Sequence, residues 1–171
     1  THDVNEMSAP LNTEFLFREK ELKAAQEKIA ISDVLILSGH AGVGKTKLAL
    51  QLCKTLAEQN SWETVCIKSN NLELFDDLAT TFDTSKEYIV LVDDANELSS
   101  LHLVLDYHHK MVENTRFVRK IILTVRDYAR QQVVNEVLEV EKPEILKIEL
   151  FNDEEIRKLM ETVYGITNHL F

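Results

Sequence analysis

Residues 39–46 have the types and the spacing of a phosphate-binding loop, G-x-x-x-x-G-K-[ST]. Glycines let the backbone curl until successive N–H groups face one point, an arrangement that binds anions. We expect Lys45 to reach the β- and γ-phosphates of a nucleotide, and the Thr46 hydroxyl to ligate magnesium. The residues of this segment expected to bind the nucleotide are Gly39, His40, Ala41, Gly42, Val43, Gly44, Lys45, Thr46 and Lys47.

The segments on either side of the loop have the character that such a site requires. Residues 34–37 form an unbroken apolar run, which is typical of a parallel strand covered on both faces. Residues 48–57 instead carry apolar side chains at helical spacing. The N-terminus of that helix adds free N–H groups and a positive dipole end. A turn that only closes a strand-helix unit would not need Lys45 and Thr46, so the sequence favours a nucleoside triphosphate site.

A second candidate cluster follows the apolar strand predicted at 88–92, which ends in Asp93 and Asp94. Ligands of open α/β sheets lie at the carboxyl ends of the strands, so these acids should emerge beside the phosphate loop. Asp93 is the candidate to hold magnesium, directly or through water. Asp94 is the candidate catalytic base, although it could instead cap a helix that begins near Asn96. An Asp is one methylene shorter than the commoner Glu, so we expect slow hydrolysis.

A third candidate cluster ends the strand predicted at 119–124. If this strand inserts between the phosphate-loop strand and the acidic strand, Thr124 and Arg126 arrive near the γ-phosphate. An arginine that meets this group would distinguish ATP from ADP, because the two ligands differ by it. The alternative is a surface ion pair of Arg126 with Asp127 or Glu97, which contributes little energy.

Strands and helices alternate along the chain, a pattern that predicts a parallel sheet with helices on both faces. We expect a three-layer α/β P-loop NTPase fold with about five strands in the order 5-1-4-3-2. The predicted strands are 34–38, 63–68, 88–92, 119–124 and 145–149, and the predicted helices are 45–59, 71–82, 96–113, 127–139 and 153–164.

The composition narrows the class of protein. The 171 residues carry a formal net charge of −10, which argues against direct nucleic-acid binding by this domain, because affinity for phosphate backbones comes from clustered Lys and Arg. No apolar stretch approaches the length of a membrane span, so we expect a cytoplasmic protein without a membrane partner. Cys53 and Cys66 are interpreted as buried thiols in a reducing compartment. The pair His108 and His109 is expected to be exposed to solvent rather than to bind a metal.

Four segments in this order resemble the nucleotide-binding domain of STAND ATPases, the signal-transduction ATPases that include the NACHT and NB-ARC groups. The segments are FLFREKEL at 15–22, LILSGHAGVGKT at 35–46, VLVDD at 90–94 and ILTVRD at 122–127. The family usually has a glycine before the arginine of the first segment, where this chain has Phe17, whereas Arg18 and Glu21 match. Arg18 is therefore added to the expected nucleotide-binding residues.

The resemblance implies a nucleotide switch that acts together with further domains of a longer chain. ADP holds such proteins closed, and a sensed ligand permits exchange for ATP and self-association through this domain, in bacteria often for antiphage defence. We expect a lead-in at 1–13, the nucleotide-binding domain at 14–150, and the start of a helical segment at 151–171 whose helix Asp153 caps. The sensor and effector portions are not in this sequence.

Two rival hypotheses remain open from the sequence. One is a mechanical ATPase of the AAA+ type, which needs an arginine from a neighbouring subunit worth about three to five decades of rate. Arg116, Arg119 and Arg130 are possible donors, none in a distinctive motif. The other is a nucleotide-binding scaffold that does not hydrolyse, with Asp94 as a helix cap.

Overall fold

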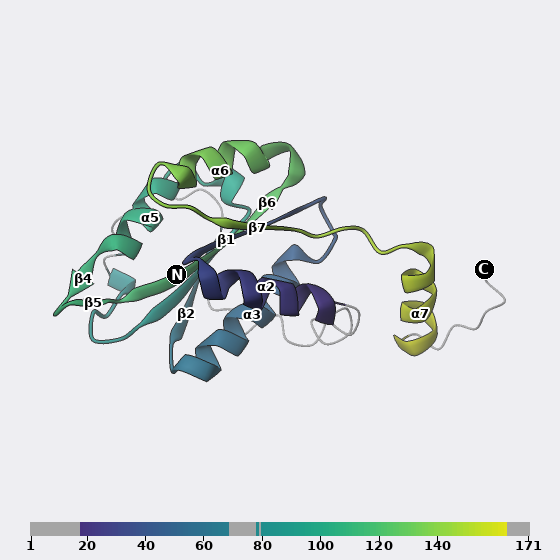
Figure 1. The fold of residues 1–171 in the computed structure, drawn as a ribbon, viewed down its shortest axis with the longest axis horizontal. Coiled ribbons are helices and arrows are strands. Elements are labelled where there is room, and N and C mark those ends of the chain that lie inside the picture. The colour runs from purple at the N-terminus through teal and green to yellow at the C-terminus, as the bar shows by residue number, and fades with distance from the viewer. Residues whose placement is uncertain (1–17, 69–77, 79, 164–171) are drawn as a thin grey trace.

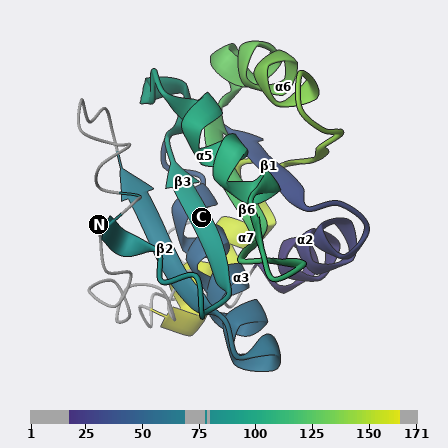
Figure 2. The ribbon, with the colours of Figure 1, turned by 90° about the vertical axis from the view of Figure 1, so that its left-hand side faces the viewer.

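The computed structural model describes residues 18–68, 78 and 80–163 (Figure 1). Five parallel strands form the central sheet: β1 (Val34–Gly39), β2 (Glu63–Lys68), β3 (Tyr88–Asp93), β6 (Val118–Arg126) and β7 (Glu144–Lys147). Their order is β2-β3-β6-β1-β7, and Figure 2 shows β2, β3, β6 and β1 side by side. Numbered along the chain, this is the predicted order 5-1-4-3-2, which is therefore confirmed.

Both faces of the sheet are buried, because successive side chains of each strand alternate between two apolar clusters. Val34 and Ile36 of β1 belong to one cluster, whereas Leu35 and Leu37 belong to the other. On the first face lie the helices α5 (Leu101–His109) and α6 (Arg130–Leu138), and on the second lie α2 (Glu19–Ile31) and α3 (Lys45–Asn60). The three predicted layers are thus present.

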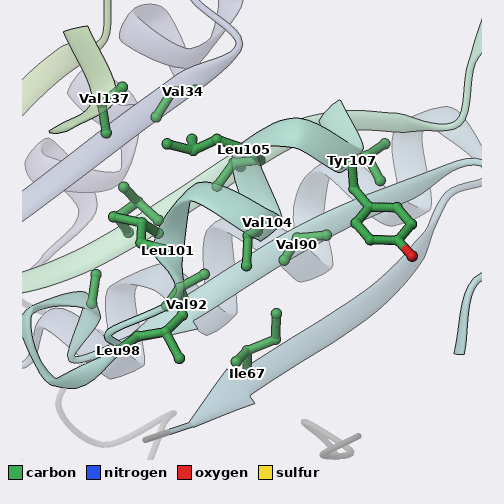
Figure 3. Close-up of a cluster of buried hydrophobic side chains, with 14 of the residues drawn as sticks. Val34, Ile67, Val90, Val92, Leu98, Leu101, Val104, Leu105, Tyr107 and Val137 are labelled. Carbon is green, nitrogen blue, oxygen red and sulfur yellow. The ribbon is translucent and has the colours of Figure 1, made fainter. Parts of the chain in front are cut away.

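Figure 3 shows side chains of the first cluster in close-up. Leu101, Val104 and Leu105 of α5 belong to this cluster together with Val90 and Val92 of β3. Each of these five side chains is at most 1% exposed. Burying one such side chain contributes about 1.5–3 kcal/mol relative to leaving it in water, so this contact anchors β3 and the acids at its end.

Two differences from the predicted elements concern helices. The helix α2 precedes β1 and was not among the predicted elements, although its Ala25 and Ile29 are buried against the sheet. The helix predicted at 96–113 is shorter: a 3-10 turn, η2 (Ala95–Glu97), precedes α5, which ends at His109. A two-stranded hairpin, β4 (Met111–Val112) and β5 (Thr115–Arg116), follows it.

The hairpin ends the predicted helix for a local reason. Glu113 and Asn114 at its tip have φ angles of 53° and 64°, a left-handed pair that suits a two-residue turn between antiparallel strands. The helix predicted at 127–139 is likewise split into a 3-10 turn, η3 (Asp127–Ala129), and α6. Most of the helix predicted at 71–82 falls on 69–77 and 79, outside the described residues.

The last described helix, α7 (Asp153–Val163), lies apart from the sheet at the end of an extended connector (Figure 1). Asp153 was expected to cap it, and this was wrong. The Glu155 N–H donates to Asn152 Oδ1 at 2.8 Å, and the Asn152 N–H donates to Glu155 Oε1 at 3.2 Å. This reciprocal pair is a capping box, so Asn152 is the cap and Asp153 begins the helix.

The prediction that both adjacent histidines are exposed is confirmed for His109 and was wrong for His108. His109 is exposed, whereas His108 is completely buried. The His108 Nε2 atom lies 3.3 Å from Asp33 Oδ2 and 3.1 Å from Glu141 Oε1, and its Nδ1 lies 2.7 Å from the Val118 carbonyl oxygen. Tertiary contacts from three segments bury this ring at the amino ends of β1 and β6. Among the described residues, no helix is long and apolar enough to cross a bilayer.

Candidate nucleotide-binding site

The phosphate loop connects β1 to α3, as its position between an apolar strand and an amphipathic helix predicted. Gly42 and Gly44 have φ angles of 81° and 95°, which side chains rarely allow, so glycine is required at both. Gly39 is required for another reason: a Cβ atom there would lie 2.7 Å from the Ile148 carbonyl oxygen. The loop is therefore curled as a phosphate-binding loop needs to be.

Lys45 lies at the start of α3 and is 7% exposed. Its ammonium donates hydrogen bonds to the carbonyl oxygens of Gly39 at 2.9 Å and His40 at 2.7 Å, which hold it inside the loop. Burial lowers the pKa of Lys45 from its ordinary value, and the nearby carboxylate of Asp94 opposes this effect. The charge of Arg126 lowers the pKa further.

Asp93 joins the loop to the two strands beside it. The Thr46 hydroxyl donates to Asp93 Oδ1 at 2.7 Å, and the Thr124 hydroxyl donates to the same oxygen at 2.8 Å. The sheet order explains the convergence, because β6 lies between β1 and β3, and all three strands end at the same edge. A carboxylate and a hydroxyl this close are the hard oxygen ligands that magnesium prefers, so the donor set fits that ion.

Asp94 has a left-handed backbone, with φ 51° and ψ 58°, which is uncommon for a residue with a side chain. Its N–H donates to the Thr124 hydroxyl at 2.8 Å. Asp94 occupies the position before η2, but its side chain makes no capping hydrogen bond. The alternative in which this carboxylate caps the following turn is therefore absent, and its charge acts on Lys45 instead.

Arg126 is exposed at the end of β6, opposite Gly39 in the strand register. Within the described part of the chain its guanidinium forms no ion pair with Asp127 or Glu97, so the alternative surface pair is absent. Its backbone N–H donates to Asn96 Oδ1 at 3.5 Å, a long hydrogen bond. The guanidinium thus remains at the rim of the site, close enough to influence Lys45.

Arg18 lies on the other side of the loop and is 5% exposed. Its Nη2 atom donates to the carbonyl oxygens of Val43 at 2.8 Å and Glu149 at 2.9 Å, and its Nη1 atom pairs with Glu21 Oε1 at 3.1 Å. The guanidinium carbon lies 4.0 Å from the centre of the Phe151 ring. The structure therefore places Arg18 against the backbone of the loop.

The remaining predicted residues lie along the loop. His40 is exposed, with Nε2 3.6 Å from Asp127 Oδ2; Ala41 and Gly42 are exposed, Val43 is buried, and Lys47 is in the first turn of α3. The structure thus brings together Lys45, Thr46, Asp93, Asp94 and Thr124, with Arg126 at the rim. The sequence analysis missed the contacts of Asn96 and Phe151. The contact of Asn96 could have been found, because Asn96 is a polar residue shortly after the acidic strand. No local signal in the sequence pairs Phe151 with Arg18.

The sequence matches the family model described as Novel STAND NTPase 3 over residues 16–164, well over half of the chain. No curated protein matches the sequence.

Solved structures with the same fold are P-loop ATPases. Cdc6p from Pyrobaculum aerophilum aligns with a TM-score of 0.63 and 13% identity, over 84% of this chain and 48% of that one. The Orc1 protein of Aeropyrum pernix, solved in complex with DNA, aligns at 0.58 and 15%, over 86% and 49%. A variant of Thermotoga maritima RuvB aligns at 0.55 and 19%, over 84% and 48%. The chain thus spans about half the length of these structures, and at such identities the likeness shows the fold.

Proposed function

Because the chain belongs to the novel STAND NTPase family, we propose that residues 14–150 form an ATP-binding switch domain that hydrolyses ATP slowly. The observation that carries this proposal is the convergence of the Thr46 and Thr124 hydroxyls on one oxygen of Asp93. The phosphate-loop hydroxyl, the acid and a polar residue of the intervening strand are the groups that a triphosphate with magnesium requires.

Each residue of the site has a proposed role. The loop amides and Lys45 bind the phosphates. Thr46 and Asp93 would hold magnesium, which would neutralise charge on the phosphates. Asp94 accepts a proton from water as the water oxygen bonds to the γ-phosphorus, while the bond from that phosphorus to the ADP oxygen breaks. The absence of a capping hydrogen bond supports this role, because the Asp94 carboxylate is not committed to η2.

The switch itself is assigned to the end of β6. A ligand shifts a conformational equilibrium only through its different affinity for the two states. We assign the contact with the γ-phosphate to Thr124 and Arg126, and two observations support this: the Thr124 hydroxyl donates to Asp93, and the charge of Arg126 acts on Lys45. We assign self-association to the ATP-bound form. We assign the sensor and the effector to further domains of a longer bacterial defence protein in the cytoplasm, a reducing compartment in which free thiols such as that of Cys53 persist.

The second candidate function is a mechanical ATPase that acts on protein or nucleic acid. The likeness of the fold to RuvB and to the DNA-bound Orc1 protein favours it, and the net charge of −10 speaks against direct DNA contact by this domain. The two candidates differ in turnover. A switch retains ADP on purification and turns over slowly, whereas a motor turns over fast and is stimulated by its polymer.

The test of the proposal is the affinity for ATP with magnesium, measured by calorimetry. Lys45→Ala removes the buried ammonium, and we expect affinity to fall by roughly a hundredfold or more. Lys54→Ala, an exposed lysine of the same helix, is the matched control and should leave affinity unchanged. If the folded wild-type protein does not bind ATP, or if Lys45→Ala binds it equally well, the proposal is wrong.

A further inference from the structure

Arg18 is buried although its charge is permanent, so its contacts need to compensate for the loss of water. Glu21 supplies the opposite charge, and two backbone carbonyl oxygens accept from the same nitrogen, Nη2. One carbonyl belongs to Val43 in the phosphate loop, and the other belongs to Glu149 in the connector between β7 and α7. A single guanidinium thus links two segments that are far apart in the sequence.

The contact with Val43 determines the direction of the next amide. A peptide unit is planar and trans, so the Val43 C=O and the Gly44 N–H point in opposite directions. Because Nη2 holds the carbonyl oxygen on the Arg18 side, the Gly44 N–H points away from Arg18. This peptide plane rotates about ψ of Val43 and φ of Gly44, and glycine at position 44, with φ 95°, allows more than one orientation, so an external anchor keeps the plane in one of them.

The connector approaches the loop at a second place. The Ile148 N–H donates to the Ser38 carbonyl oxygen at 2.7 Å, and Gly39 leaves no room for a Cβ beside the Ile148 carbonyl. Phe151 then covers the guanidinium, with its ring centre 4.0 Å from the Arg18 Cζ atom. Residues 148–151 therefore touch both ends of the phosphate loop, directly at one end and through Arg18 at the other.

We infer that Arg18 is a positioning residue that fixes the Val43–Gly44 peptide plane, and that it couples the connector 148–151 to the affinity of the phosphate loop. This inference rests on the proposed function and deepens it. The position of α7, which follows the connector, would then regulate how well the loop binds phosphates. In the phosphate loop, Arg18 donates to a backbone atom, the Val43 carbonyl oxygen, so it acts on the ligand through Val43.

The test separates phosphate binding from base recognition by using two ligands. Inorganic triphosphate carries the phosphates without a base, and ATP carries both. We expect Arg18→Ala to lower the affinity for both ligands by the same factor, about tenfold, because the loop amides that bind the phosphates lose their fixed orientation. A loss confined to ATP would mean that Arg18 contacts the base, and unchanged affinities would mean that the anchor is not needed; either result overturns the inference.

Two further variants keep the test valid if Arg18→Ala does not fold. Arg18→Lys retains the charge but not the planar fork that bridges two carbonyls, so we expect an intermediate loss for both ligands. Phe151→Ala changes only the connector, and we expect a several-fold loss for both ligands. Unchanged affinity in Phe151→Ala would overturn the coupling. Lys20→Ala, exposed on the same helix as Glu21, is the matched control, and thermal unfolding reports folding of every variant.

The outcomes separate this inference from the proposed function. If the wild-type protein binds ATP and Lys45→Ala lowers the affinity as expected, the phosphate loop is established whatever the Arg18 variants show. If neither ligand binds the wild-type protein, the proposed function fails first.

Discussion

Asp93 accepts hydrogen bonds from two hydroxyls that belong to different elements, α3 and β6. An asparagine in its place retains an acceptor oxygen for both hydroxyls but has no charge for a cation. The observed contacts of the residue with the two hydroxyls and its proposed binding of magnesium can therefore be separated by one substitution.

We expect Asp93→Asn to remove the dependence of ATP affinity on magnesium while leaving thermal stability nearly unchanged. Calorimetric titration with ATP, in magnesium and in a chelator, measures the dependence. Asp106→Asn, an exposed acid on α5, is the control. If the Asp93→Asn protein still binds ATP more tightly with magnesium, the ion is held elsewhere.

Arg126 is the residue proposed to distinguish ATP from ADP. We expect Arg126→Ala to lower the affinity for ATP by about tenfold and to change the affinity for ADP little, because a charge-assisted contact to the γ-phosphate is lost. Arg119→Ala changes an exposed arginine at the opposite end of β6 and should change neither affinity. An unchanged ratio of the two affinities in Arg126→Ala would contradict the sensor role.

Among the elements, β1 and the segment after β7 come close together at the start of the phosphate loop. Gly39 ends β1, and a side chain there would meet Ile148 backbone at 2.7 Å and Val43 Cγ2 at 2.9 Å. Backbone does not move aside as a flexible side chain does. The end of β1 therefore requires glycine because there is no space for a side chain. Position 42 requires glycine for another reason, its positive φ angle.

We expect Gly39→Ala to lower the free energy of unfolding by about 1–3 kcal/mol, because the added methyl forces the two segments apart. Urea unfolding measures this change. Ala41→Ser adds an atom to an exposed position of the same loop and should stay within about 0.5 kcal/mol of wild type. A Gly39→Ala protein as stable as wild type would show that the connector yields without cost.

For the molecule as a whole, His108 and its neighbours form a second polar cluster at the opposite edge of the sheet from the phosphate loop. Burial lowers the pKa of His108, and the nearby charge of Arg116 lowers it too, whereas the Val118 carbonyl and the carboxylates of Glu141 and Asp33 raise it. A hydrogen bond from Lys120 lowers the pKa of Asp33 despite its partial burial, so this carboxylate stays charged.

The lowered pKa predicts loss of stability on acidification. In the unfolded chain His108 binds a proton near its ordinary value of 6.5, and in the folded protein only at lower pH. Below that value the unfolded state binds more protons, so the free energy of unfolding falls as the pH falls from about 6.5 toward 5. Chemical denaturation across this range measures the slope. We expect His108→Gln to flatten it and His109→Gln to retain it; equal slopes in all three proteins would contradict the assignment.

The fold and its family were predictable because their signals are local. Apolar runs predicted the five strands, and the strand order β2-β3-β6-β1-β7 agrees with the sequence prediction. The capping of α7 by Asn152 and the hairpin after His109 were missed, because capping and turn geometry depend on one or two residues within a longer helical pattern.

The sequence by itself determined the five strands, the phosphate loop and the acids at the end of β3, since each depends on residues that are neighbours in the chain. Only the tertiary structure decided which side of the loop Arg18 supports, because its partner Glu149 lies 131 positions away. It likewise decided that His108 is buried, because Asp33 and Glu141 close over the ring from other segments. Spacing along the chain predicts what a strand or loop is, whereas burial and charge pairing are set by the packing of segments remote in sequence.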